Sequence, residues 1–268
     1  MLIAQISDCH VEATDGPGIG GSDPGGNLAL CVTQINARDP RPDAVLATGD
    51  LVNDGSPDSY AVLRRLLAPL TMPVYLIPGN HDDRSALRDA FPDHGYLPAD
   101  GDFLHYVIDE HPLRLIGLDT VIPREMGGLM DATRCAWLDA RLGEAPDRPT
   151  VVFMHHPPFL TGLAKMDAMG CAGGGAMGDV IARHAQVERV LCGHVHRPVQ
   201  TRWNGVLTCT APSTAAQLRL KLGPEDALEW SPEPPAYLLH FQHAEAGLLT
   251  HMAVIDGAAP PKASPIIM

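Results

Sequence analysis

The chain has 268 residues, of which 45% are hydrophobic, 19% charged and 5% aromatic. This composition is typical of a folded globular chain, and it excludes a disordered protein, a coiled coil and a collagen. The formal net charge is −13 at pH 7. Because an acidic chain repels the phosphates of DNA and RNA, we expect no polymeric nucleic acid as a partner.

The N-terminus and the cysteines predict a cytoplasmic protein. Residues 1–7, MLIAQIS, lack the basic region and the cleavage site of a signal peptide. No apolar run approaches the ~18 residues that cross a bilayer, so we expect no membrane insertion. The six cysteines are scattered without a CxxC pair. This usage is typical of reduced, buried thiols in the cytoplasm.

Short apolar segments rich in Val, Ile and Leu alternate with segments of helical pattern. The predicted strands are 2–7, 44–48, 74–78, 113–119, 150–154 and 189–192. The predicted helices are 27–38, 57–68, 84–91, 131–142 and 176–185, the fourth with Asp131 as its candidate N-cap. Strands that alternate with helices favour an α/β fold with much parallel pairing.

Three segments are predicted to be long loops: 13–26, 120–131 and 160–179. The first is rich in glycine but lacks the GK[ST] and GxGxxG patterns, so we expect a flexible rim rather than a phosphate cradle. The third is rich in Gly and Met. Loops of this length are often lids or binding segments, and the sequence leaves their role open.

The chain changes character after residue 212. Residues 213–235 are rich in Ala, Gln, Pro and Glu, 237–242 and 248–255 are predicted to form a hairpin, and 256–268 is expected to be loosely ordered. We therefore predict a catalytic domain at 1–212. Residues 213–268 would be a C-terminal cap or an oligomerisation extension.

Five short polar motifs each follow a predicted strand. They are Asp8-Cys9-His10, Gly49-Asp50-Leu51-Val52-Asn53, Gly79-Asn80-His81-Asp82, His155-His156-Pro157-Pro158 and Gly193-His194-Val195-His196. Ligands bind at the carboxyl ends of strands in open α/β sheets, so the motifs are expected to converge on one crevice. One such motif alone would be an ordinary polar turn. Five of them would be costly to bury without a metal or a partner.

The residue types of these motifs suit divalent metal ions. Carboxylate, imidazole and amide groups without thiolate favour Mn, Fe, Co or Zn. In an extended segment alternate side chains leave the same side, so Asp8 and His10 would point together and Cys9 away from them. Three of the motifs begin with a glycine, which permits a sharp turn and a close approach of the backbone.

The five motifs resemble those of the calcineurin-like metallophosphoesterase superfamily: D-x-H, G-D, G-N-H-[DE], H and G-H-x-H. They span residues 8–196. Asn53 and the Met-rich segment 160–179 resemble the branch that contains class III cyclic nucleotide phosphodiesterases and bacterial glycerophosphodiesterases. The resemblance implies a four-layer α/β/β/α sandwich of two packed mixed sheets flanked by helices, with a C-terminal extension.

The resemblance also implies a role for each motif residue. The expected ligands are Asp8, His10 and His196 for a first ion, Asn80, His155 and His194 for a second, and Asp50 as the bridge. His81 would stay unligated, where it would contact the substrate phosphate or protonate the leaving group. Asn53 would contact the phosphate, and His156 would be structural.

Such a pair of ions serves phosphodiester hydrolysis. Two metals about 3.5–4 Å apart clamp the attacking and leaving oxygens, and a bridging hydroxide forms near neutral pH and attacks phosphorus. Two divalent ions, Asp8, Asp50 and the hydroxide would leave a single positive charge, which matches a monoanionic diester. Asp54 stands where protein phosphatases of the superfamily usually carry Arg. Like-charge repulsion there disfavours a dianionic monoester.

The leading interpretation is a metal-dependent hydrolase of small phosphodiesters, either cyclic nucleotides or glycerophosphodiesters, with two divalent ions (Fe, Mn, Zn or Co). The alternative enzyme is a phosphomonoesterase or a nucleotide pyrophosphatase on the same site. The alternative from another class is a non-catalytic scaffold, but such proteins typically lose ligands. The resemblance further implies a homo-oligomer, a dimer or larger, built partly through the extension.

Overall fold

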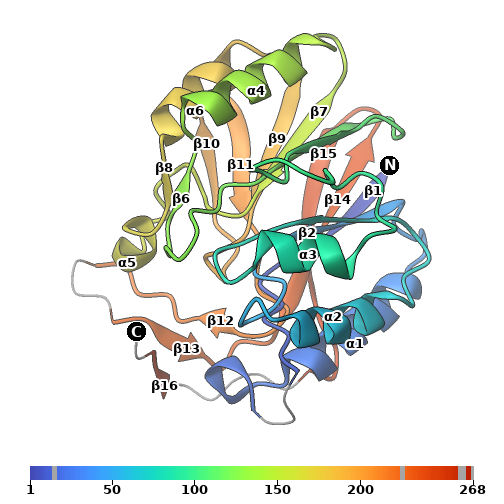
Figure 1. The fold of residues 1–268 in the computed structure, drawn as a ribbon, viewed down its shortest axis with the longest axis vertical. Coiled ribbons are helices and arrows are strands. Elements are labelled where there is room, and N and C mark those ends of the chain that lie inside the picture. Colours follow the sequence, from blue (N-terminus) through green and yellow to red (C-terminus); the bar gives the residue numbers. More distant parts are fainter. Residues whose placement is uncertain (14–16, 224–226, 259–263, 267–268) are drawn as a thin grey trace.

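The computed structural model describes residues 1–13, 17–223, 227–258 and 264–266. Two mixed sheets pack against each other and carry helices on their outer faces (Figure 1). This arrangement confirms the four-layer α/β/β/α sandwich expected from the motifs. No helix in the described ranges is long and apolar enough to cross a membrane.

The first sheet has five strands. They are β1 (Leu2–Ile6), β2 (Ala44–Thr48), β3 (Val74–Ile77), β14 (Ala236–His243) and β15 (Gly247–Val254). Their order is β15-β14-β1-β2-β3, with β1, β2 and β3 parallel and β14 antiparallel to β1. β1 and β2 are buried along their whole length, because the sheet is covered on both faces. This burial explains their unbroken apolar runs.

The second sheet has six strands. They are β4 (Tyr106–Ile108), β5 (Arg114–Leu118), β7 (Thr150–Met154), β9 (Val187–Cys192), β10 (Gln200–Trp203) and β11 (Val206–Thr210). Their order is β10-β11-β9-β7-β5-β4, with antiparallel pairing only at the two edges. The sequence predicted β5, β7 and β9 but not β4, β10 or β11. β10 alternates exposed and half-buried residues, so it lacks the apolar run of a central strand.

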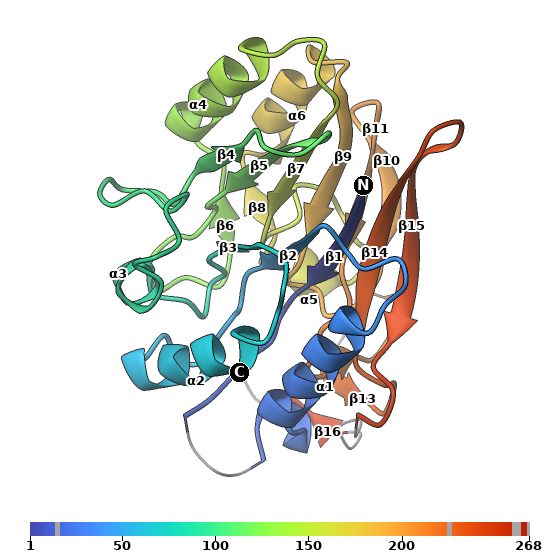
Figure 2. The same ribbon diagram turned by 90° about the vertical axis from the view of Figure 1, so that its right-hand side faces the viewer.

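Six α-helices flank the sheets. They are α1 (Pro24–Asn36), α2 (Pro57–Leu67), α3 (Arg84–Ala90), α4 (Ala132–Gly143), α5 (Ala164–Asp167) and α6 (Gly174–Ala182) in the described ranges. α1 and α2 lie beside the first sheet, and α4 and α6 beside the second (Figure 2). Asp131 caps α4 as predicted, since its side chain accepts a hydrogen bond from the N–H of Arg134. The apolar layer between the sheets includes Leu46, Ile77 and Phe153.

The predicted loops contain more regular structure than expected. Segment 13–26 includes a 3-10 helix at Ile19–Gly21 and the first turn of α1, while its residues 14–16 lie outside the described ranges. α1 begins early because Asp23 accepts from the N–H of Gly26 and Pro24 suits the first helical position. Segment 160–179 contains α5, β8 (Cys171–Ala172) and the start of α6. β8 pairs with β6 (Gly128–Leu129), which lies within segment 120–131.

The C-terminal segment is divided between two sheets. The predicted hairpin is present as β14 and β15, and it completes the first sheet rather than standing outside it. A third, small sheet, the cap sheet, consists of β12 (Gln217–Leu218), β13 (Glu229–Ser231) and β16 (Ser264–Pro265). It lies below α5 in Figure 1. The division of the chain at residue 212 and the oligomerisation role of 213–268 stay predictions.

Candidate metal centre

The loops that follow β1, β2, β3, β7 and β9 carry all seven expected ligands to one place. The residues are Asp8 and His10 after β1, Asp50 after β2, Asn80 after β3, His155 after β7, and His194 and His196 after β9. These loops leave the carboxyl ends of parallel strands, which is the edge where α/β sheets bind ligands. The predicted convergence therefore follows from the order of the strands.

A first buried group consists of Asp8, His10, Asp50 and His196. Their potential ligand atoms all lie within 4.8 Å of one another. The Nε2 atoms of His10 and His196 are 3.1 Å apart, and Nε2 of His196 lies 3.3 Å from Oδ1 of Asp8. One nitrogen or oxygen from each side chain thus surrounds a single small volume.

A second group lies on the other side of Asp50. Nε2 of His155 is 3.2 Å from Oδ1 of Asn80 and 3.3 Å from Oδ2 of Asp50. The same Oδ2 atom lies 3.7 Å from Nε2 of His10 in the first group. Asp50 therefore lies between the two groups, which is the position that a bridging carboxylate needs. His194 and His155 also belong to a buried histidine cluster with ligand atoms within 4.8 Å.

Hydrogen bonds from the protein fix the orientation of the histidine rings. Nδ1 of His155 lies 2.8 Å from the carbonyl oxygen of Thr48, and Nδ1 of His196 lies 2.7 Å from that of Ala216. Because a carbonyl only accepts, each Nδ1 carries a proton, and Nε2 is the ring nitrogen that can bind a metal ion. Histidines that bind metals are typically held in this way.

His10 is held by an amide rather than by a carbonyl of the main chain. Its Nδ1 lies 3.1 Å from Oδ1 of Asn53, and Nδ2 of Asn53 donates to Glu12 at 2.5 Å. The carboxylate of Glu12 thus sets which end of the amide faces His10. The main-chain carbonyl of Asn53 accepts from Nδ1 of His81 at 2.8 Å. Sequence reasoning did not single out Glu12, and a contact of Asn53 with substrate stays a prediction.

The charged groups of the site indicate that it binds cations. Asp8 and Asp50 are buried, and in the described ranges only histidines form ion pairs with them. Burial raises the pKa of Asp8, and it lowers the pKa of His194 to about 3. Burial also opposes protonation of His155, but the Asp50 carboxylate raises the pKa of that ring to about 9. Two buried carboxylates without Arg or Lys fit a site for bound cations.

The second histidine of the His-His pair differs from its neighbour. Nδ1 of His156 lies 2.7 Å from the Thr120 hydroxyl, and Nε2 lies 3.2 Å from the carbonyl oxygen of Met126. Both ring nitrogens are therefore used within the protein, which fits the structural role expected for His156. By contrast, the buried Nε2 of His194 has no hydrogen-bond partner in the described part of the chain.

Five of the expected ligands have a left-handed backbone, and four of them belong to the Asp-x-His and His-x-His motifs, for which an extended segment was predicted. They are Asp8 (φ 51°), His10 (φ 44°), Asp50 (φ 48°), His194 (φ 71°) and His196 (φ 50°). The reason is that β1 ends at Ile6 and β9 ends at Cys192, so both motifs lie beyond the regular strands. Cys9 and Val195 nevertheless point into apolar clusters, as predicted. Such strained positions cost roughly 1–3 kcal/mol each and concentrate at functional sites.

The glycines of the motifs allow the loops to touch. A Cβ atom on Gly49 would lie 2.5 Å from Nδ1 of His155, and one on Gly79 would lie 2.3 Å from Oδ1 of Asp50. Gly49 also has a φ of 85°. Any side chain at either position would therefore displace an expected ligand, which confirms the close approach inferred from the sequence.

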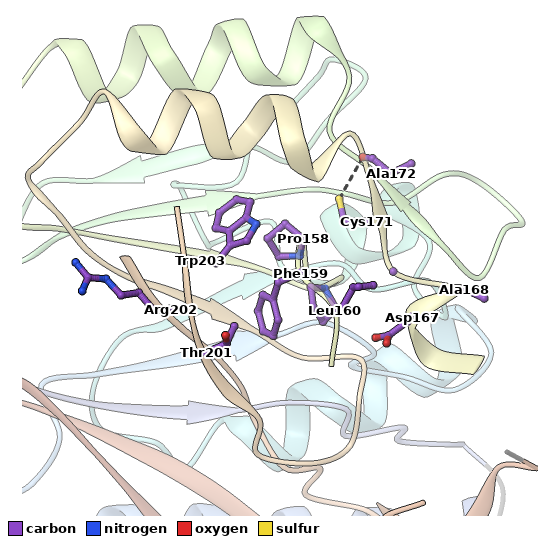
Figure 3. A pocket seen from close by; sticks show the side chains of 12 residues that line it. Pro158, Phe159, Leu160, Asp167, Ala168, Cys171, Ala172, Thr201, Arg202 and Trp203 are labelled. Atoms are coloured by element: carbon purple, nitrogen blue, oxygen red, sulfur yellow. Dashed lines mark hydrogen bonds between the residues drawn. The ribbon is translucent and has the colours of Figure 1, made fainter. Parts of the chain in front are cut away.

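A cavity of about 460 Å³ opens over the metal centre, and His10, Asp50, Asn80, His81, His194 and His196 form its floor. A larger groove of about 590 Å³ is lined by Phe159, Leu160 and Trp203 (Figure 3) and by none of the expected site residues. Asp54 does not line the cavity, contrary to the sequence argument. Its carboxylate instead accepts from the N–H of Ser56, just before α2.

Comparisons with known proteins agree with this geometry. The chain matches the calcineurin-like phosphoesterase family over residues 1–198. It is 36% identical over 265 residues to a glycerophosphodiester phosphodiesterase of Enterobacter lignolyticus, which covers 97% of this chain and 94% of the relative. It is 33% identical over 217 residues to a 3',5'-cyclic adenosine monophosphate phosphodiesterase of Pseudomonas aeruginosa, which covers 81% of this chain and 77% of the relative.

A solved structure shares the fold. A dimetal phosphatase from Danio rerio superposes with a TM-score of 0.67 at 14% identity, over 96% of this chain and 99% of that one. At this identity the likeness concerns the fold alone. The family match and the identity to relatives over nearly the whole chain go further, and they show that this chain belongs to the calcineurin-like phosphoesterase family.

Proposed function

We propose that the chain hydrolyses small phosphodiesters with the help of two bound divalent metal ions. The observation that carries this proposal is the convergence of seven nitrogen and oxygen ligands around Asp50. The ions would supply a nucleophile from water near neutral pH and positive charge at the phosphate. Names of relatives support the same reaction class, since they include glycerophosphodiester and cyclic nucleotide phosphodiesterases.

The ligand assignment follows the two groups. The first ion would be held by Asp8, His10 and His196, the second by Asn80, His155 and His194, and both by Asp50. Imidazole, carboxylate and amide donors without thiolate suit Fe, Mn, Zn or Co. The orientation of the rings supports this assignment, because three of the histidines donate a hydrogen bond from Nδ1 and thereby direct Nε2 toward the ion sites.

His81 would move the proton to the leaving group. It lines the cavity, and its ring centroid lies 4.7 Å from that of His10. Its main-chain N–H donates to Oδ1 of Asp50 at 2.9 Å, and its Nδ1 donates to the carbonyl of Asn53. The ring is thus fixed beside the metal centre with Nε2 available for a proton. A histidine placed in this way typically contributes ~10²–10⁴-fold to the rate.

The charge of the cavity favours a diester over a monoester. Among the described residues that line it, none is Arg or Lys, so a dianionic phosphate would have only the metal ions to balance it. The reason given by the sequence was the carboxylate of Asp54, but the structure offers a different one, the lack of a cation in the walls. Cyclic nucleotides and glycerophosphodiesters both carry the single negative charge that this site suits.

A comparison of two chromogenic substrates tests the proposal. After chelation and reloading with Mn²⁺, Zn²⁺ or Co²⁺, we expect hydrolysis of bis(p-nitrophenyl) phosphate to exceed that of p-nitrophenyl phosphate in kcat/KM. Faster cleavage of the monoester would favour the alternative phosphomonoesterase. No cleavage of either ester by the loaded protein would favour a binding scaffold.

The assembly and location are part of the same proposal. We propose a homo-oligomer built partly through residues 213–268, which expose Leu220 and, at 71%, Leu222. A cytoplasmic location is supported by the six cysteines, all of which are free thiols. Light scattering on the full chain tests the assembly, and a monomer at micromolar concentration would contradict it.

A further inference from the structure

The cavity over the metal centre has a polar floor and apolar walls. Its polar side chains are the expected ligands and His81, and every other described residue that lines it is apolar. Ile19 of the 3-10 helix, Met166 of α5 and Met169 just after it form one part of the wall. Two segments that are distant in the sequence thus border the space where the organic part of a substrate would lie.

The cap sheet supplies the opposite part of the wall. Leu218 of β12 and Trp230 of β13 are paired across the two strands, and both line the cavity. The ring centroid of Trp230 lies 5.5 Å from that of His196, with 49° between the ring planes. An ester group on a phosphate held at the metal centre would therefore reach the indole directly.

Charged side chains in and near the cap sheet form ion pairs with one another and do not line the cavity. Arg197 binds Glu233 at 2.9 Å, Arg219 binds Glu229 at 3.1 Å, and Lys221 also binds Glu229. None of these three cations lines the cavity. A substrate that carries a second phosphate or a carboxylate would find no described cation beyond the metal centre.

We infer that this site selects phosphodiesters in which one ester group carries an uncharged, flat ring that packs against Trp230 and the methionines. Rings gain from burial and from stacking on an indole, and thioethers adapt to their shape. The hydroxyls of a glycerol ester would instead lose water with few partners to replace it, because the indole N–H of Trp230 is the one polar side-chain group among the described wall residues. The inference rests on the proposed function and favours ring-bearing diesters, such as cyclic nucleotides, over glycerophosphodiesters.

Three diesters with alkyl leaving groups of similar acidity test this selectivity. Benzyl methyl phosphate, glyceryl methyl phosphate and dimethyl phosphate are compared on the Mn²⁺-loaded protein, with products followed by ³¹P NMR. We expect kcat/KM for the benzyl ester to exceed that for the other two at least tenfold. If the glyceryl ester is cleaved as well as the benzyl ester, the inference is wrong while the proposed function stands. If no diester is cleaved, bis(p-nitrophenyl) phosphate included, the proposed function fails.

Variants at Trp230 test whether the ring of the substrate binds in the cavity. Trp230→Ala is expected to lower kcat/KM for the benzyl ester about tenfold and for dimethyl phosphate less than threefold, and Trp230→Phe to restore most of the loss. Trp203→Ala is the matched control, because Trp203 lies in the groove of Figure 3 and does not line the cavity. An equal loss for both esters in Trp230→Ala would mean that Trp230 only supports the cap, and it would overturn the inference.

Binding without hydrolysis gives an independent measurement. Diphenyl phosphate, a slowly cleaved diester, is expected to quench tryptophan fluorescence in the unmodified protein and in Trp203→Ala, but not in Trp230→Phe. Dimethyl phosphate at the same concentration should leave the fluorescence unchanged. Quenching that persists in Trp230→Phe would place the ring elsewhere and contradict the inference, whatever the activity of the protein.

Discussion

His10 and His196 direct their Nε2 atoms toward each other across 3.1 Å. The Nδ1 proton of each ring is committed elsewhere, to Oδ1 of Asn53 for His10 and to the carbonyl of Ala216 for His196. Two lone pairs at this distance repel each other unless a cation lies beside both. The Asp8 carboxylate, 3.3 Å from Nε2 of His196, adds negative charge to the same place. The first ion site is therefore preformed in the polypeptide.

Metal content should depend differently on the shared and the unshared ligands. We expect two ions per chain in the unmodified protein, one in Asn80→Ala, and fewer than one in Asp50→Asn, because only Asp50 lies between both groups. Mass spectrometry of dialysed protein measures the content. A rise of the melting temperature on metal addition should accompany it, since a ligand at a hundred times its Kd stabilises by about 2.7 kcal/mol.

An exposed carboxylate provides the control for this series. Asp93→Asn changes an exposed side chain that binds Arg64 and contributes to neither metal group, so it should leave the metal content at two. Retention of two ions in Asp50→Asn would contradict the bridging position. Loss of both ions in Asn80→Ala would mean that the two groups act as one site.

His81→Asn should lower the rate by about 10²–10⁴-fold while the metal content stays at two, because proton donation is lost and no expected ligand is removed. The loss should be larger for dimethyl phosphate than for bis(p-nitrophenyl) phosphate, since nitrophenolate leaves without a proton. Steady-state kinetics on both esters measure the difference. An equal loss on both would assign His81 to phosphate binding instead. His243→Asn, at an exposed histidine of β14, should leave both rates unchanged.

Asn53→Leu should weaken the first ion by about 10–100-fold, because it removes the acceptor that orients His10. Titration with Co²⁺, followed by its absorption spectrum, measures the two affinities separately. Asn36→Leu is the matched control, since Asn36 bonds the carbonyl of Pro69 outside the site. Equal weakening of both ions in Asn53→Leu would point to a general disturbance of the loop after β2.

The sequence predicted those strands that can be identified from the residue pattern of a short segment alone. Central strands such as β2 and β7 are buried on both faces, so their apolar runs identify them directly. The edge strand β10 could not be found in this way, because half of its residues face solvent. The start of α1 was missed by three residues although Asp23 and Pro24 are a capping signal.

The sequence predicted that the expected ligand residues converge, but it did not predict the groups that hold them in place. The motifs name the side chains, and the order of strands brings them together. The acceptors that hold the rings depend on the whole fold: Thr48 is 107 positions from His155 in the chain, and Ala216 is 20 positions from His196. Both acceptors are main-chain carbonyl oxygens, which every residue has, so no residue type in the sequence identifies them. The apolar wall around Trp230 was missed because its side chains come from segments that are distant in the sequence.

His240 is a buried histidine of β14 in the first sheet, and its protonation is expected to destabilise the fold in acid. Its Nε2–H donates to Oε1 of Gln5 at 3.0 Å, and its Nδ1 lies 2.9 Å from the hydroxyl of Thr250, which Arg189 also contacts. Burial, and after it the charge of Arg189, lowers the pKa of His240 to about 3, from an unfolded value of 6.5. The folded state thus binds fewer protons than the unfolded state between these values, and stability falls as the pH falls from 6.5 toward 3.

His240→Gln should therefore flatten the pH dependence of stability, although it lowers stability at pH 7 by loss of packing. For the unmodified chain this one group contributes a loss of about 1.4 kcal/mol for each pH unit below 6.5. Urea unfolding of the chelated protein at pH 7, 5.5 and 4 measures the slope without interference from metal release. His251→Gln, at an exposed histidine of β15, should keep the slope of the unmodified chain. Equal slopes of stability against pH in all three proteins would show that protonation of His240 does not cause the loss of stability in acid.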